Sequence, residues 1–252
     1  SSAALSLTMA RCCEAGLRHD GNLVALLPVL RFIGLDGEAA MLAATNGVNT
    51  QKGLLFSLGI TAAAVGWLFA VNRQVTAVSI TSAIKEMTEG IVERELLALS
   101  GKTNCELTAG ERLFRAYGTR GIRGEMEDGL PAVKYMALPA LQAALGRGLS
   151  INQALLQTLF VLMAVVEDTT VINRHSPDKL VNWVRPLVES FLKDGGVYSD
   201  EGYGRAAELD QWFIEHNVSP GGAADLLAIT WFLHALESRL NSEEAGRNKT
   251  SF

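Results

Sequence analysis

The sequence predicts an all-α protein that folds as a single compact multi-helix domain with a central buried apolar helix. Three observations predict this class. Apolar residues recur with helical spacing along most of the 252 residues, whereas the alternation typical of strands is scarce. Residues 53–71 form an uncharged stretch that is long enough for a central helix. Glycines and capping residues then separate the apolar segments from one another.

The periodicity and the punctuation together predict where the helices lie. The expected ranges are 3–16, 22–33, 36–45, 52–71, 76–98, 108–117, 131–147, 151–167, 177–193, 203–216 and 220–240. The glycines expected to stop helices are Gly34, Gly101, Gly118 and the pair Gly195 and Gly196. The expected starts are a capping box from Thr108 to Glu111, a cap at Ser150 or Asn152, and Ser219 before Pro220.

The uncharged stretch over residues 53–71 has two interpretations. Lys52 and Arg73 flank it, and its length suffices to cross a bilayer. However, it is rich in Ala, Gly, Ser and Thr, and no second segment is equally free of charge. We therefore expect a buried helix of a soluble protein and no membrane partner.

Composition limits the classes of protein that the chain can represent. Apolar residues make up 48% and charged residues 19%, which excludes a disordered chain, and the net charge of −5 indicates no nucleic-acid partner. The three cysteines, Cys12, Cys13 and Cys105, have no disulfide or zinc spacing, which favours a reduced, cytoplasmic location. We expect a catalytic domain over residues 1–240, a polar tail over 241–252, and a further segment upstream of residue 1.

Four segments are rich in Gly, charge and small polar residues, and each borders an apolar helix: 45–53, 112–128, 167–175 and 219–225. We expect them to gather around one cleft. The first leads into a helix N-terminus, where free N–H groups and Lys52 suit a phosphate, although an ordinary cap with a surface lysine has the same pattern.

The second segment carries four guanidiniums, from Arg112, Arg115, Arg120 and Arg123. They could clamp a triphosphate, while Glu125, Glu127 and Asp128 could hold Mg²⁺ or act as a general base. The alternative is a solvated loop whose charges neutralise one another.

The last two segments place carboxylates beside apolar helices. Asp168 ends a helix expected to be buried, so it needs a metal or Arg174 as its partner. Gly221 and Gly222 are poor residues for a first helical turn unless their backbone touches a ligand or a neighbouring helix, and Asp225 faces an apolar run. Since no GxGxxG, Walker A, HExxH or GxSxG motif is present, these patterns by themselves predict a helical protein with a polyanion site.

Taken together, the four segments resemble a known family. The matching strings are GVNTQKGLLFSLG, TAGERLFRAYGTRGIRGEMEDGLP, LMAVVEDTTVINR and LDQWFIEHNVSPGGAADLLAITWFL. They resemble, in the same order and over about residues 40–236, the signature segments of the triphosphoribosyl-dephospho-CoA synthase family, which serves citrate lyase and malonate decarboxylase. The family usually has His where Gln51 stands, Asn where Thr170 stands, and a Gly pair where His175 and Ser176 stand. Its Lys-Pro-Gly-Leu-Val-Asp segment would precede this chain.

The resemblance implies a transferase that forms 2′-(5″-triphosphoribosyl)-3′-dephospho-CoA and adenine from ATP and 3′-dephospho-CoA. The product would be a prosthetic-group precursor, passed to an acyl carrier protein holo-synthase, and Mg²⁺ is the expected cofactor. The catalytic or magnesium-binding residues would be Glu125, Glu127 and Asp168. The phosphate- and nucleotide-binding residues would be Asn49, Thr50, Lys52, Arg112, Arg120, Arg123, Arg174, Ser219, Gly221, Gly222 and Asp225.

Two alternatives to this function stay open. The scaffold could serve another ATP-dependent transferase or a phosphohydrolase, which would release ADP or phosphate rather than adenine. The change at Gln51 also allows a nucleotide-binding protein with impaired catalysis. A homodimer is possible, because helical proteins of this composition have apolar surface to bury.

Overall fold

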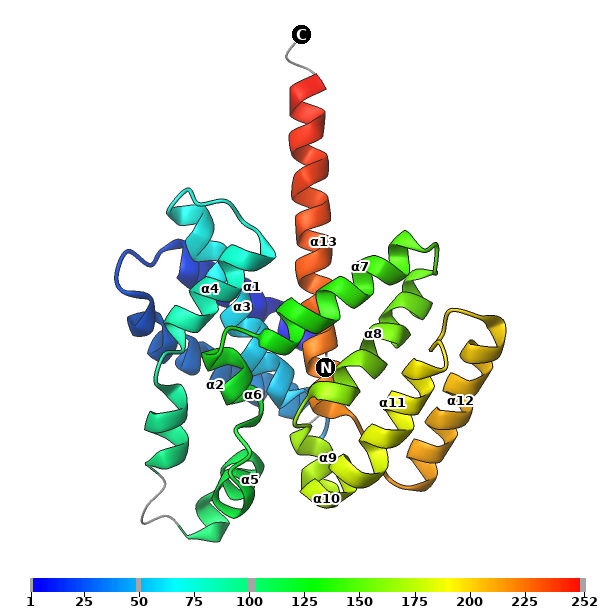
Figure 1. Cartoon of the computed structure of the whole chain (residues 1–252). Coiled ribbons are helices and arrows are strands. Elements are labelled where there is room, and N and C mark those ends of the chain that lie inside the picture. The colour runs from blue at the N-terminus through cyan, green and yellow to red at the C-terminus, as the bar shows by residue number, and fades with distance from the viewer. Residues whose placement is uncertain (1, 49–50, 99–102, 250–252) are drawn as a thin grey trace. The chain divides into compact units, whose positions relative to one another are not determined.

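The protein is all-α, as the sequence predicts. The computed structural model describes residues 2–48, 51–98 and 103–249, and no β-strand occurs among them (Figure 1). The chain divides into two compact units, residues 1–89 with 228–252 and residues 90–227. The single domain over residues 1–240 stays a prediction.

The first unit is built around one central helix. Its elements are α1 (Ser2–Leu17), η1 (Leu23–Ala25), α2 (Leu26–Ala44), α3 (Lys52–Ala70), α4 (Ala77–Met87) and the later part of α13 (Gly221–Lys249). Helix α3 packs against α1, α2 and α4 (Figure 1). One glycine on each helix allows the close packing of α3 on α1, because a Cβ on Gly16 of α1 would lie 2.0 Å from the Ala63 carbonyl oxygen and one on Gly66 of α3 would lie 2.1 Å from that of Cys13.

Helix α3 is the only described helix that is long and apolar enough to cross a membrane. Its most apolar window is 61% buried, and Ile60, Ala63, Ala64 and Leu68 are each at most 2% exposed. Burial of this extent is what a core helix shows, and it agrees with the predicted central apolar helix.

The predicted break at Gly34 is wrong. Helix α2 runs without interruption from Leu26 to Ala44. Its buried face continues past Gly34 through Gly37 to Met41, and a Cβ on Gly37 would lie 2.7 Å from the Thr8 side chain of α1. Tertiary packing therefore outweighs the low helix propensity of the two glycines.

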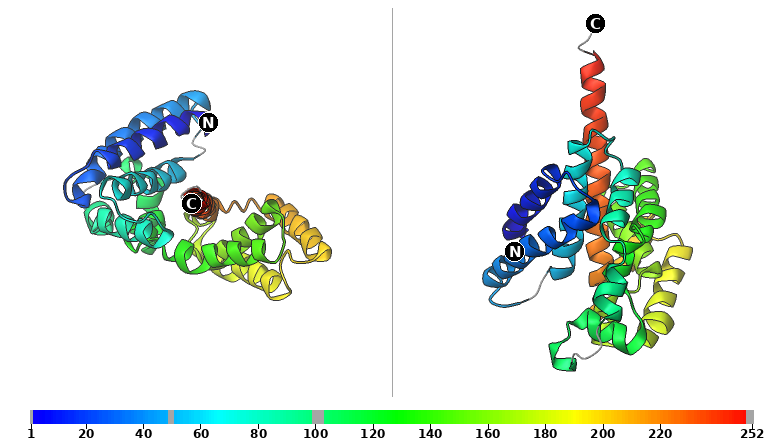
Figure 2. Two further views of the ribbon diagram at one scale, coloured as in Figure 1. Left: turned by 90° about the horizontal axis from the view of Figure 1, so that it is seen from above. Right: turned by 90° about the vertical axis from the view of Figure 1, so that its left-hand side faces the viewer.

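The second unit holds most of the polar segments. Its elements are η2 (Glu93–Leu97), η3 (Asn104–Glu106), α5 (Ala109–Tyr117), α6 (Gly121–Glu127), η4 (Val133–Ala137), α7 (Leu138–Gly146), α8 (Ile151–Val165), α9 (Thr169–Arg174), α10 (Pro177–Lys179), η5 (Leu180–Val184), α11 (Arg185–Lys193), α12 (Asp200–Glu215) and the start of α13. Helices α7, α8, α11 and α12 each pack against the next (Figure 2). The rings of Phe160 and Phe191 meet between α8 and α11, with centroids 4.5 Å apart.

Several predicted helix ends are confirmed. The Thr108 hydroxyl accepts from the Glu111 N–H, and the Glu111 carboxylate accepts from the Thr108 N–H. Ser150, rather than Asn152, caps α8. Gly118 ends α5 with φ +73, and Gly195 and Gly196 follow α11 with positive φ. The expected stop at Gly101 lies outside the described residues.

Other predicted boundaries need correction. The helix expected over 76–98 ends at Met87, and Gly90 adopts φ +71 before η2 begins. Short helices α6 and α9 lie where the sequence predicted only polar loops. The last helix, expected to end at residue 240, continues to Lys249, and Glu243 pairs there with Arg239 and Arg247 one turn away on either side.

Candidate functional site

Three of the four polar segments meet in the second unit, at the starts of α6, α9 and α13. A Cβ on Gly121 would lie 2.6 Å from the methyl group of Thr169, and one on Gly221 would lie 2.5 Å from the hydroxyl of Thr170. Gly121 also has φ +52, which favours glycine. These glycines therefore allow close contact between protein segments, and for Gly221 this is the packing alternative left open by the sequence.

Asp168 joins the starts of two helices. Its Oδ1 accepts from the N–H groups of Thr170 (2.9 Å) and Val171 (3.2 Å), so it caps α9. Its Oδ2 accepts from the N–H of Ala223 (2.9 Å) in the first turn of α13. The side chain is 2% exposed. Burial raises the pKa of this carboxyl, while its backbone hydrogen bonds oppose the rise. Asp168 thus caps the starts of both helices, and its catalytic or magnesium-binding role stays a prediction.

The start of α13 lies one residue later than the sequence predicts. The helix begins at Gly221, one residue after Pro220. In the first turn of the helix, the Ala223 N–H donates a hydrogen bond to Asp168, which comes from a distant part of the chain. A Cβ on Gly222 would lie 3.3 Å from that carboxylate, so glycine allows the approach. The carboxylate also places negative charge at a helix N-terminus, where the helix dipole stabilises it.

Asp225 lies one turn into α13, beside Asp168. Burial, followed by the negative charge of Asp168, raises the pKa of the Asp225 carboxyl from 3.8 to about 7. This carboxyl therefore holds its proton to a far higher pH than an exposed aspartate does. Two neighbouring carboxyls in such different surroundings are typical of acid–base sites.

The raised pKa of Asp225 predicts a specific pH dependence of stability. The folded state keeps the proton up to about pH 7, whereas the unfolded state loses it near pH 3.8, so this group stabilises the fold at low pH and loses that effect as pH rises through the window. Relative to Asp225→Asn, the unchanged protein should be about 1–3 kcal/mol more stable at pH 5 than at pH 8. Urea unfolding of both proteins in EDTA at the two pH values measures this. Parallel pH profiles would contradict the prediction.

Glu125 is held by an unusual turn after α6. Gly129 and Leu130 both have positive φ, +79 and +57, and the Leu130 side chain is fully buried, which anchors the turn. The turn brings the Ala132 N–H to 3.3 Å from Glu125 Oε2. Burial raises the pKa of the Glu125 carboxyl. The Ala132 hydrogen bond and the charge of Arg120 oppose that rise, and the charges of Asp128 and Glu167 add to it.

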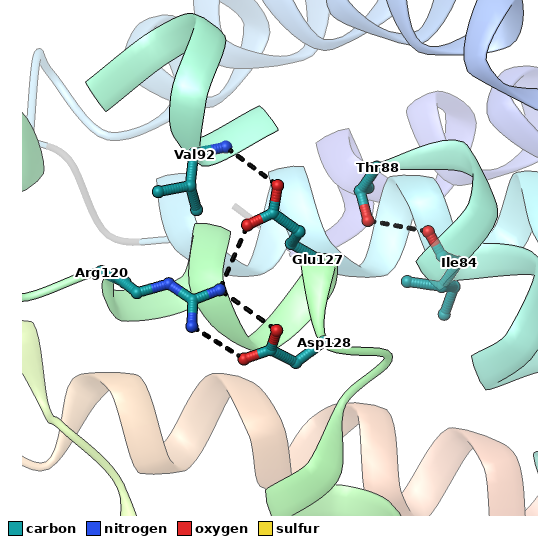
Figure 3. A network of polar contacts seen from close by, with 6 residues as sticks. All are labelled: Ile84, Thr88, Val92, Arg120, Glu127 and Asp128. Carbon is teal, nitrogen blue, oxygen red and sulfur yellow. Dashed lines mark hydrogen bonds and ion pairs between the residues drawn. The ribbon is translucent and has the colours of Figure 1, made fainter. Parts of the chain in front are cut away.

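Arg120 faces two carboxylates of the same segment. Its Nη1 lies 2.9 Å from Asp128 Oδ2, and its Nη2 lies 3.1 Å from Glu127 Oε2 (Figure 3). Glu127 also accepts weakly from the Val92 N–H at 3.4 Å. The hydrogen bond to Asp128, as the largest cause, raises the pKa of the guanidinium. The arginine is 39% exposed, so an anion can approach it.

The other predicted cations of this unit also contact protein groups. Arg123 Nε lies 2.8 Å from Glu95 Oε2. Arg112 donates to the Leu107 carbonyl at 2.7 Å. Arg174 donates to the Asn217 side chain at 3.2 Å, two residues before Ser219. Arg120 and Arg123 flank the start of α6, whereas Arg112 lies one helix earlier.

The remaining predicted residues belong to the first unit or lie outside the described chain. Asn49 and Thr50 are outside the described residues. Lys52 begins α3 and forms an ion pair with Glu38 of α2. Both line a cavity of about 160 Å³, which sequence reasoning missed. The signal was present, since Leu27, Arg31, Gly34 and Glu38 recur every three or four residues and so share one helix face.

A scan against family models finds a match over residues 1–244 to the CitG family, described as ATP:dephospho-CoA triphosphoribosyl transferase. Three relatives are named "probable 2-(5″-triphosphoribosyl)-3′-dephosphocoenzyme-A synthase". That of Malonomonas rubra is 41% identical over 91% of this chain and 72% of its own length. That of Vibrio cholerae serotype O1 (strain M66-2) is 44% identical over 88% of this chain and 71% of its own length. That of Lactiplantibacillus plantarum is 38% identical over 88% of this chain and 77% of its own length. No solved structure matches the chain significantly.

The family match covers nearly the whole chain, and the relatives match most of their own length. The family predicted from the four signature segments is thereby confirmed, and with it the class of enzyme. ATP and dephospho-CoA are the substrates of the family's reaction. The chain belongs to the ATP:dephospho-CoA triphosphoribosyl transferases, enzymes that join the triphosphoribosyl group of ATP to dephospho-CoA.

Proposed function

We propose that the second unit carries the catalytic groups of this transfer, with Glu125 as the general base. The observation that supports this most is the Glu125 carboxyl, which is partly buried, has a raised pKa and lies near the charge of Arg120. A carboxylate in such surroundings binds a proton more readily than an exposed one, which suits general-base catalysis.

In the proposed reaction, a ribose hydroxyl of dephospho-CoA attacks C1′ of the ATP ribose. The new C–O bond forms as the bond between C1′ and adenine breaks, and Glu125 takes the proton of the hydroxyl. Asp225, whose carboxyl is still half protonated near pH 7, donates a proton to the departing adenine. Asp168 holds the α13 turn that carries Asp225.

The cations near the start of α6 would hold the triphosphate. Arg120 presents a planar fork of donors that matches phosphate oxygens, and Arg123 lies one turn further along. Their charge would oppose the negative charge of the phosphates while positive charge develops at C1′. Lys52 belongs to the first unit, so its predicted role in phosphate binding is separate from this cluster.

Mg²⁺ fits the chemistry of the donors around Glu125. Among the described residues, no group of three acidic, His or Cys side chains is arranged to hold a metal ion. The charges of Asp128 and Glu167 nevertheless raise the pKa of Glu125, and a divalent cation would relieve that repulsion. Glu167 would hold the ion together with phosphate oxygens, which leaves Glu125 to take the proton, and the ion would neutralise phosphate charge. Glu127 already contacts Arg120 and so contributes less.

Chromatography of the full chain incubated with ATP, dephospho-CoA and Mg²⁺ tests the function. The expected products are free adenine and triphosphoribosyl-dephospho-CoA, which would pass to an acyl carrier protein holo-synthase. Release of ADP or phosphate would point to a different transferase or a phosphohydrolase. ATP binding without adenine release would indicate impaired catalysis.

Replacing Arg120 with Lys tests the phosphate assignment. Lysine keeps the charge but loses the planar fork, so we expect the KM for ATP to rise about tenfold with a smaller change in kcat. Arg205→Lys is a matched control, because Arg205 also pairs with an aspartate and is similarly exposed, 40% against 39%. Equal effects of the two variants on KM would remove Arg120 from the site.

A further inference from the structure

The cavity of the first unit has the size of a flat ring system. It lies among α1, α2 and α3, and its volume is about 160 Å³. A cavity of about 150 Å³ with apolar walls is known to hold benzene, so this one has room for an aromatic ring system. Its inner wall is apolar, and it includes the Cys12 thiol, whose pKa burial raises to about 11 and which is therefore neutral.

Polar and aromatic groups surround this apolar interior. Glu38 contributes a carboxylate, which accepts hydrogen bonds, while Lys52 and Arg31 contribute donors. The Phe56 ring also lines the cavity, and the Arg31 guanidinium lies 4.7 Å from its centroid. A ligand that matches this set is flat, offers one donor and several acceptors, and tolerates an apolar wall.

We propose that this cavity binds the adenine base of a substrate nucleotide, with the exocyclic amine of the base donating to Glu38. The ring nitrogens of adenine are acceptors, which suits Arg31. Phosphates attached to the same nucleotide would lie toward Lys52, at the N-terminus of α3. The choice of adenine rests on the proposed function, since both ATP and dephospho-CoA carry this base.

Gly34 allows the cavity to be filled without disturbing the fold. It lines the cavity, and a Cβ placed on it meets no atom within 4 Å. Gly34 also lies inside α2, where leucine has the higher helix propensity. We therefore expect Gly34→Leu to fold with an equal or higher Tm and to lose adenosine binding at least tenfold.

Gly204→Leu is the matched control. Gly204 lies inside α12, a Cβ on it also meets no atom within 4 Å, and it does not line the cavity. The control should show the same helix gain and bind adenosine as the unchanged protein does.

The test is calorimetric titration of the full chain and both variants with adenosine, inosine, pantetheine and tripolyphosphate. Adenosine should bind at least tenfold more tightly than inosine, because the inosine oxygen cannot donate to Glu38. Glu38→Gln should remove that preference. Adenosine binding by Gly34→Leu at the affinity of the unchanged protein would overturn the proposal. Loss of pantetheine binding by Gly34→Leu, without loss of adenosine binding, would also overturn it.

Two further measurements separate this inference from the proposed function. Titrations of Gly34→Leu with ATP and with dephospho-CoA show which nucleotide uses the cavity, since only that affinity should fall. Adenosine binding that depends on Gly34 in a protein that releases no adenine would support the cavity and contradict the catalytic proposal. Normal adenine release, together with adenosine binding that is insensitive to Gly34 and Glu38, would support the catalytic proposal and contradict the cavity proposal.

Discussion

Asp168→Ala should lower the free energy of unfolding by about 3–5 kcal/mol, the largest stability effect that the second unit predicts. The substitution removes the acceptor for the N–H groups of Thr170, Val171 and Ala223, in a place that is 2% exposed. A buried N–H without a partner costs about 1–3 kcal/mol, and loss of a helix cap costs about 0.5–2 kcal/mol. Removing a buried carboxylate offsets part of this loss, because burial disfavours its charge.

Denaturant unfolding, with the slope checked for a two-state transition, measures the effect. Asp168→Asn keeps an oxygen for the start of α9 but can turn an amide N–H toward Ala223, so an intermediate loss of about 1–3 kcal/mol is expected. Asp178→Ala is the control, since Asp178 is exposed and accepts a local hydrogen bond from Asn182, four residues along the chain. A loss at Asp168 no larger than that at Asp178 would show that the carboxylate does not hold the two helices.

Glu125→Gln should lower kcat for adenine release by about 10²–10⁴-fold, the range that removal of a general base produces. The amide has nearly the same shape and can still accept from the Ala132 N–H, but it cannot take a proton from the attacking hydroxyl. The KM for ATP should change little, because the phosphates are assigned to Arg120 and Arg123. Steady-state assays of adenine, with unfolding curves to verify the fold, provide the measurement.

Glu189→Gln is the control for this charge change, because Glu189 is exposed on α11. It should leave kcat within about twofold, as expected for a surface substitution. If Glu125→Gln turned over as fast as the control, Glu125 would leave the catalytic set. A loss at Glu125 that is confined to KM would instead assign the residue to substrate or Mg²⁺ binding.

The long apolar helices could be predicted from the sequence because their signal is local. The capping box at Thr108, the cap at Ser150 and the stop at Gly118 depend on residues that are neighbours in the chain, and the structure confirms each. The break predicted at Gly34 was wrong because packing of α2 on α1 outweighs glycine's low propensity. Local sequence signals therefore mispredict a helix boundary where contacts between distant segments stabilise the helix.

The sequence by itself determined the helical class, the buried α3 helix, the family and the segments that carry the polar residues, because composition, periodicity and motif strings are properties of the chain. Only the tertiary structure decided what those residues contact. It assigned Asp168 to the starts of α9 and α13, placed Asp225 beside it, and closed a cavity between α1, α2 and α3. The physical reason is that burial, hydrogen-bond partners and pKa depend on groups brought together from distant positions, here 55 residues apart for Asp168 and Ala223.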